Sequence, residues 1–167
     1  MPKITIPRTN DFREVDSWRR IISDGAMQSS FFVYKSADQT GIASGVWTQI
    51  TWDTEEYDTN NDFASSIFTP TIAGKYLFTA VLEFSSLGDN VNVLTGLYKN
   101  GSLVRRGVGI SGGAATFAAA LLCAEIEANG TGDYFEIYGI HYHGSARDAR
   151  GGQPYFCSFA GHRIPFS

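Results

Sequence analysis

The sequence predicts an all-β protein, built as a sandwich or jelly roll. Aromatic residues make up 14% of the chain and 18 of its 167 residues are glycine. Aromatic and β-branched residues between glycines are typical of strands and turns. Turn signals separate about eight to ten strand-like segments after residue 30. Hydrophobic residues reach 43% and charged residues only 18%, which indicates a folded domain rather than a disordered chain.

Residues 1–28 are distinct from the β-rich part, which we assign to a single head domain over residues 29–167. The first ten residues contain Pro2 and Pro7, which favour an extended arm. Asp11, with Glu14 three residues later, predicts the start of a short helix that ends near Gly25. Such a short helix needs a partner for its apolar stripe, so we assign the stripe to attachment or to a trimer stub. The stripe consists of Phe12, Val15, Trp18 and Ile22.

The segment 74–84 predicts a strand that is apolar on both faces. Successive side chains of a strand point to opposite faces. One face carries Tyr76, Phe78, Ala80, Leu82 and Phe84, and the other carries Leu77, Thr79 and Val81. An antiparallel sheet usually has one wet face. We therefore expect two covers on this strand: the facing sheet and a second copy of the chain.

Three more segments are apolar on both faces: 31–34, 115–124 and 155–164. We expect these four strands to form one sheet between the other sheet and a neighbouring subunit. The alternative is that bulges shift the phase of these strands. The other strands look one-sided, with Val104, Val108 and Ile110 opposing Arg105. The residues that we assign to the subunit interface are Phe31, Tyr76, Phe78, Phe117, Leu121, Phe156 and Phe159.

Short motifs follow one another between residues 31 and 164. They are Phe31-x-x-Tyr34-Lys35-Ser36, Tyr57-Asp58, Phe63, Phe68-Thr69-Pro70, Gly74-x-Tyr76-x-Phe78, Tyr98-Lys99-Asn100-Gly101, Gly132-Asp133-Tyr134 and Phe156-x-x-Phe159-x-Gly161. In order and spacing they resemble the globular head of complement C-one-q, which shares the jelly roll of tumour necrosis factor. The resemblance implies a ten-strand, two-sheet jelly roll that assembles as a homotrimer. It also implies an inner sheet made of the first, third, sixth and last main strands.

Two departures from that family bear on the role. Ala160, His162 and Arg163 interrupt the closing motif, and the chain has no Gly-x-y repeat of a collagen stalk. Such trimeric heads also resemble receptor-binding or decoration modules of bacteriophage fibres. The N-terminus lacks the apolar run of a signal peptide. We therefore expect a virion protein made in the host cytoplasm, attached to a capsid or tail protein through its arm. The alternative is a ligand-binding bacterial protein, in the cytoplasm or at the cell surface.

The sequence motifs favour a binding protein over an enzyme. No phosphate loop, nucleophile elbow or zinc-protease motif occurs, so we assign no catalytic residue. The net charge of −4 disfavours a nucleic-acid partner. No apolar run approaches the ~20 residues that a membrane span needs. Paired carboxylates can hydrolyse glycans, which makes a hydrolase the remote alternative, although a solvated acidic loop is favoured. The carboxylates in question are Glu55, Glu56, Asp58 and Asp62.

The segment 144–152 is the best candidate for ligand binding. It is rich in glycine and carries Arg147, Asp148 and Arg150. Loops held by a rigid scaffold often carry recognition, although this one could also be a mobile connector. With the loops at 37–45, 86–90 and 111–114 it should form one end of the head. The expected ligand lies on a host-cell surface, with a glycan as one candidate, and three sites per trimer would add avidity.

We expect no cofactor. His141 and His143 have a spacing that can bind a metal, but a polar outer strand face is favoured. Some members of the resembled family bind calcium, which leaves Asp89 and Asp148 as calcium candidates. Two cysteines cannot form the framework of a small secreted protein. We therefore interpret Cys123 and Cys157 as buried free thiols rather than a disulfide.

Overall fold

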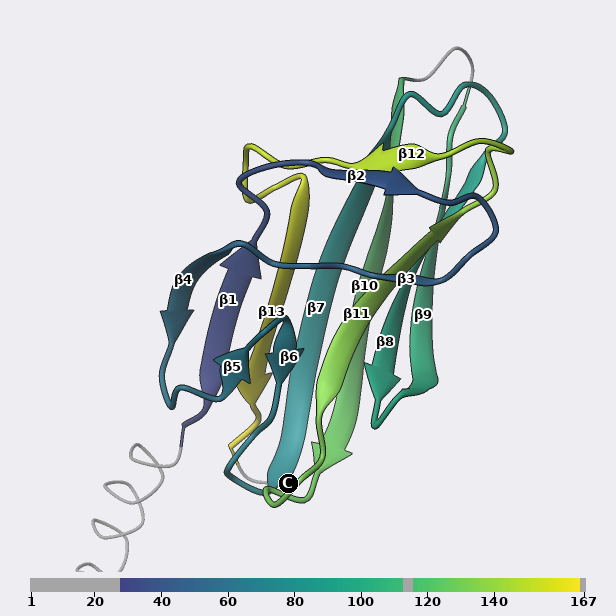
Figure 1. The fold of residues 1–167 in the computed structure, drawn as a ribbon. Coiled ribbons are helices and arrows are strands. Elements are labelled where there is room, and N and C mark those ends of the chain that lie inside the picture. The colour runs from purple at the N-terminus through teal and green to yellow at the C-terminus, as the bar shows by residue number, and fades with distance from the viewer. Residues whose placement is uncertain (1–27, 113–115, 166–167) are drawn as a thin grey trace, which may run out of the picture.

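A computed structural model describes residues 28–112 and 116–165 as a sandwich of two antiparallel sheets (Figure 1). The predicted arm and helix, with Phe12, Val15, Trp18 and Ile22, lie outside the described residues. Within the described ranges every regular element is a strand. The all-β prediction is therefore confirmed for this part of the chain.

One sheet, which we call sheet A, contains the longest strands. Its order is β4, β1, β13, β7 and β10, and β12 and β2 continue it from the end of β7. The bounds are β1 Ser30–Tyr34, β2 Gln39–Ile42, β4 Thr54–Asp58, β7 Gly74–Ser85, β10 Phe117–Ala128, β12 Arg147–Ala149 and β13 Cys157–Arg163.

The second sheet, sheet B, faces it. Its order is β5, β6, β11, β8 and β9, and β3 pairs with β11. The bounds are β3 Thr48–Gln49, β5 Phe63–Ala64, β6 Ile67–Phe68, β8 Asn92–Lys99, β9 Ser102–Ile110 and β11 Phe135–His141. The described residues thus form thirteen strand segments instead of ten, because β3, β5, β6 and β12 are short pieces of two or three residues. Such pieces are too short to leave a periodic pattern.

The four strands predicted to share a sheet are neighbours in sheet A. β1 pairs with β13, β13 with β7, and β7 with β10 along its whole length from Gly74↔Ala128 to Ser85↔Phe117. In the sequence, all four strands carry apolar residues on both faces, whereas an antiparallel sheet usually exposes one polar face to solvent. This shared property grouped the four strands together. The prediction that these four strands share one sheet is therefore confirmed.

The orientation of these strands corrects part of the interface assignment. Phe31, Tyr76, Phe78 and Phe159 are fully buried within a single chain, so they cannot contact another subunit. Their rings fill the space between the sheets: Phe31 lies 4.3 Å from Phe68, and Phe78 lies 4.6 Å from Phe135, between ring centroids. Phe117 and Leu121 point the other way and are 51% and 65% exposed.

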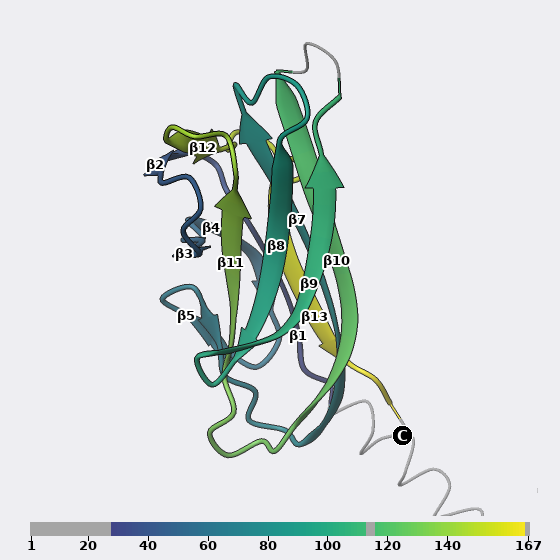
Figure 2. The same cartoon turned by 90° about the vertical axis from the view of Figure 1, so that its right-hand side faces the viewer.

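Two glycines let β9 of sheet B approach β10 of sheet A (Figure 2). A Cβ added to Gly107 would lie 1.7 Å from the carbonyl oxygen of Leu121, and one on Gly109 would lie 2.0 Å from that of Ala119. The Oγ1 of Thr95, on β8, donates to the carbonyl oxygen of Ala120 at 2.8 Å. This side of the sandwich is therefore closed by backbone packed on backbone.

Two turns at the opposite end from β12 are held by one carboxylate. Asn100 and Gly101 both have positive φ, as the predicted two-residue hairpin requires. Asp133 accepts hydrogen bonds from Asn100 Nδ2 at 2.8 Å and from the backbone N–H of Asn129 at 2.9 Å. Lys99 Nζ forms an ion pair with Oδ2 of Asp133 at 2.8 Å. The Lys99 ammonium, followed by these hydrogen bonds, lowers the pKa of Asp133 below its ordinary value of 3.8.

We expect Gly107→Ala to destabilise the fold, because its methyl group would overlap the β10 backbone. Overpacking of this kind costs about 1–3 kcal/mol in the free energy of unfolding. Urea unfolding measures the difference. Gly112→Ala is the matched control, because a Cβ there meets nothing within 4 Å. Equal unfolding free energies for the two variants would contradict the close approach of β9 and β10.

We expect Asp133→Asn to lower stability at neutral pH and to flatten its acid dependence. Because the folded pKa lies below the unfolded one, the carboxylate stabilises the native protein above about 3.8 and this contribution is lost as the pH falls through the folded pKa. Thermal melts at pH 7 and from pH 4.5 downward measure both effects. A wild type and variant with parallel pH curves would refute the role of this carboxylate.

Candidate functional site

The middle of the segment 144–152 is the strand β12, Arg147–Ala149, rather than a free loop. Arg147 pairs with Ile42 of β2, and Ala149 pairs with Gln39 of β2 and Phe84 of β7. The backbone N–H of Arg150 donates to the carbonyl oxygen of Glu83 at 2.9 Å. The sequence predicted a loop here because the strand partners lie more than 60 residues away, where a local pattern does not reveal them. These pairings fix the place of β12 on sheet A.

Arg147 and His143 form a polar pair beside β12. The Arg147 Nη2 lies 2.6 Å from His143 Nε2, and Arg147 Nη1 donates to the carbonyl oxygen of Ala146 at 2.7 Å. A guanidinium only donates, so Nε2 of His143 accepts. The proton of this ring is thus assigned to Nδ1, which donates to Ser145 Oγ at 3.1 Å. The sequence pointed to Arg147 but not to its contact with His143.

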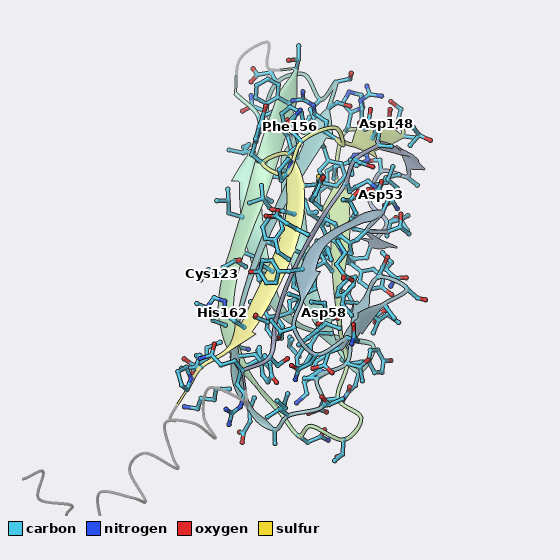
Figure 3. The ribbon with its side chains drawn as sticks, turned by 90° about the vertical axis from the view of Figure 1, so that its left-hand side faces the viewer. Asp53, Asp58, Cys123, Asp148, Phe156 and His162 are labelled. Carbon is cyan, nitrogen blue, oxygen red and sulfur yellow. The ribbon has the colours of Figure 1, made fainter. Side chains whose placement is uncertain are left out.

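Asp148 and Arg150 do not lie with Arg147 in one site. Asp148 Oδ1 accepts the backbone N–H of Gly41 at 2.9 Å and so ties β12 to β2. Arg150 forms an ion pair with Glu83, and its guanidinium lies 3.8 Å from the centroid of the Phe156 ring and 5.4 Å from that of Phe117. Figure 3 shows Phe156 and Asp148 on opposite sides of the upper end. The prediction of a three-residue site is therefore corrected: Arg150 packs on the outward face of sheet A.

The two histidines do not share an exposed strand face. His141 is fully buried, donates from Nε2 to the carbonyl oxygen of Ile42 at 2.9 Å, and accepts the N–H of His143 at Nδ1. Burial lowers the pKa of His141. The predicted polar outer face is therefore wrong for this residue. Within residues 28–112 and 116–165, no three His, Cys, Asp or Glu side chains are grouped to hold a metal ion.

The acidic residues of segment 55–62 have separate environments. Glu55 and Glu56 are exposed on the edge strand β4, which corrects the expected loop. Asp58 Oδ2 accepts the N–H of Phe63 at 2.7 Å. Asp62 is buried and accepts from Ser29 Oγ and Thr71 Oγ1, each at 2.9 Å. Asp58 and Asp62 thus hold turns through hydrogen bonds, which leaves them unlike the free carboxylates of a glycosidase pair.

The outward face of sheet A forms a second candidate surface. It presents Phe117 and Leu121 from β10, together with Phe32, whose ring stacks on Tyr57 of β4 at 6.3 Å. Cys123 and His162 lie on the same side in Figure 3. Phe156, the other residue assigned to the interface, is half-buried against Arg150.

Two exposed apolar residues on the adjacent edge strand β9 were not expected from the sequence. Val108 and Ile110 of β9 are 60% and 61% exposed, whereas the pattern had favoured an inward apolar face for them. Their alternation with Gly107 and Gly109 was the available signal, because glycines that approach a neighbouring backbone force the intervening side chains outward.

The cysteines differ in exposure. Both are free thiols; Cys157 is buried, as predicted, whereas Cys123 is exposed, which corrects its assignment. Burial raises the pKa of Cys157 to about 12. Among the described residues, no helix has the length and hydrophobicity that a membrane span requires.

Comparison with known proteins identifies the fold. No protein-family model matches the sequence, and no curated protein sequence does. A crystal structure of murine APRIL at pH 5.0 matches with a TM-score of 0.60 and 11% identity, over 82% of this chain and 99% of that chain. The structure of Eiger TNF from S. frugiperda matches with a TM-score of 0.56 and 9% identity, over 84% of this chain and 94% of that chain. At such identities the likeness concerns the fold alone, and it confirms a jelly roll of the tumour necrosis factor type.

Proposed function

We propose that the chain is a non-enzymatic, homotrimeric head that binds a ligand on a host-cell surface. The observation that carries the proposal is the apolar surface of sheet A and its edge. Phe117, Leu121, Val108 and Ile110 are each more than half exposed and lie on the neighbouring strands β9 and β10. Exposed apolar patches of this kind mark sites of protein association.

The patch turns a corner of the sandwich, which suggests how copies meet. Val108 and Ile110 lie on the β9 edge, whereas Phe32 and Leu121 lie on the outward face of sheet A. An edge that packs on the face of the next copy makes a head-to-tail contact, and such contacts form a ring when the rotation closes. The resemblance to complement C-one-q heads favours closure at three copies. In such a ring, the β9 edge of each copy would pack on the sheet A face of the next copy, so that both surfaces would be covered.

The ligand-binding end that we propose lies around β2 and β12. Figure 1 places these strands at the far end of the sandwich from the start of β1 and from the end of β13. A head attached through residues 1–28 would present this end outward. Arg147, in contact with His143, supplies a cation there.

The setting that we propose is a virion fibre or decoration protein. It rests on the resemblance to heads of bacteriophage fibres, with Phe12, Val15, Trp18 and Ile22 as the attachment residues. Genes for capsid or tail proteins beside this gene would support it, and their absence would favour a bacterial ligand-binding protein. The hydrolase alternative is not favoured, because Asp58 and Asp62 are engaged in holding turns.

We expect Leu121→Glu to convert the trimer into a monomer that stays folded. Three buried carboxylates without partners would oppose assembly, whereas in the monomer the side chain is 65% exposed. Sedimentation at micromolar concentration should show three 18.3 kDa chains for the wild type and one for the variant. Val46→Glu, at a side chain that is 52% exposed, is the control and should stay trimeric. A wild type that sediments as one folded chain would refute the assembly.

We expect Arg147→Ala to weaken binding to whole bacterial cells and to a glycan array at least tenfold through avidity. The variant should still sediment like the wild type. Arg106→Ala, which removes an exposed arginine from β9, is the control and should bind normally. If the wild type binds none of these surfaces, receptor recognition loses its support and a purely decorative role gains.

A further inference from the structure

The outward face of sheet B carries a cluster that the proposed function does not use. We call it the outer cluster; it consists of Trp47, Gln49, Tyr98, Glu136 and Tyr138 over Gly96. The strands fix its direction: Phe135 and Ile137 of β11 are fully buried in the core, so Glu136 and Tyr138 between and after them point outward. Leu97 of β8 is likewise in the core, so Tyr98 also points outward.

Three aromatic rings pack on one another in this cluster. The Tyr98 and Tyr138 centroids lie 4.2 Å apart, and Trp47 meets Tyr98 edge to face at 6.0 Å. The Trp47 ring lies over Gly96, where an added Cβ would come within 2.9 Å of it. All three rings remain partly exposed. A glycine beneath a tryptophan lets the ring lie close to the sheet and fixes its position.

A buried carboxylate lies beside these rings. Glu136 pairs across the strands with Tyr98 and is only 7% exposed. It accepts one hydrogen bond, from Gln49 Nε2 at 2.9 Å. Throughout the described part of the chain, no lysine, arginine or histidine lies within ion-pair distance of it, although four other carboxylates have such partners. Burial raises the pKa of Glu136.

We propose that the outer cluster binds a substituted ammonium group, such as a quaternary ammonium head or a methylated amine. A buried carboxylate without a cation is costly, and a bound cation would remove that cost. The faces of Trp and Tyr attract cations, and aromatic rings beside a carboxylate are suited to ammonium groups that hydrogen-bond poorly. A neutral ligand would stack on the rings but would leave the charge of Glu136 without compensation.

The outer cluster lies over β3, β8 and β11 on the outward face of sheet B. The proposed contacts Phe117 and Leu121 lie on sheet A, whereas Val108 and Ile110 border the cluster on β9, where Val108 pairs with Leu94. The inference does not rest on the binding end at β12. Among titratable groups, Tyr98 pairs with Glu136 across the strands and Tyr138 interacts with it electrostatically. Arg106 pairs with Gly96 on β9, and no ion pair joins it to Glu136 in the described part of the chain.

The test is titration of the full chain with choline, followed by NMR or by tryptophan fluorescence. Choline should perturb the signals of Trp47, and 3,3-dimethylbutanol, its neutral isostere, should bind at least tenfold more weakly. Glu136→Gln should weaken choline binding about tenfold or more, because it removes the charge and keeps the shape. Glu56→Gln makes the same change at an exposed glutamate of β4, outside the outer cluster, and is the control variant that should bind normally.

Acidity gives a second measurement. Choline binding to the wild type should weaken as the pH falls and Glu136 is protonated, whereas Glu136→Gln should bind with no such dependence. Titrations with lysine methylamide and trimethyl-lysine identify the source of the cation. Tighter binding of trimethyl-lysine than of choline would indicate a protein side chain, and tighter binding of choline would indicate a lipid or polymer head group. Three results would overturn the proposal: no binding of choline at 50 mM or below (roughly the weakest affinity that such contacts give), equal binding of the neutral isostere, or binding of neutral hexoses in place of choline.

Discussion

The packing of aromatic rings between the two sheets is the interaction on which the rest of the structure depends. Tyr76, Phe78 and Phe84 of β7 point inward and meet rings from β6, β11 and β13, all fully buried. Because side chains alternate along a strand, this choice also sets the opposite face. Leu77 and Val81 of β7, with Phe117 and Leu121 of β10, must then lie on the outside of sheet A. The choice of which β7 residues point inward therefore determines both the core and the proposed interface.

The membership of sheet A could be predicted from the sequence, but the direction of its faces could not. A period of two separates the residues of a strand into two sets and does not say which set is inside. Size was a poor guide, because large rings are inward on β7, whereas on β10 the inward set is Ala118, Ala120, Leu122 and Ala124 and the larger Phe117 is outward. The inward residues of β10 are small where β9 approaches closely at Gly107 and Gly109. Because β9 belongs to the other sheet, the pattern within β10 does not reveal this requirement.

The candidate site was predicted in part for a similar reason. The segment 144–152 was singled out for its turn residues and its two arginines. Arg147, Asp148 and Arg150 nevertheless have different partners, which are His143, Gly41 and Glu83. Two of these contacts join residues more than 60 positions apart, so local pattern could not separate the three roles. The outer cluster was missed entirely, because its members come from β3, β8, β11 and the approach to β3 and form no motif along the chain.

The close contact of β9 with β10 has a consequence for how this protein avoids fibres. An exposed strand edge is a template on which further strands can add. On one side of the sandwich, the glycine-mediated contact brings the free borders of both sheets together, so each shields the other from incoming strands. On the other side, sheet A ends in β4, where Glu55 and Glu56 place negative charge along the border. Strands of neighbouring chains would thus be unable to pair with the covered edge at β9 and β10, and negative charge would disfavour their pairing with the edge at β4.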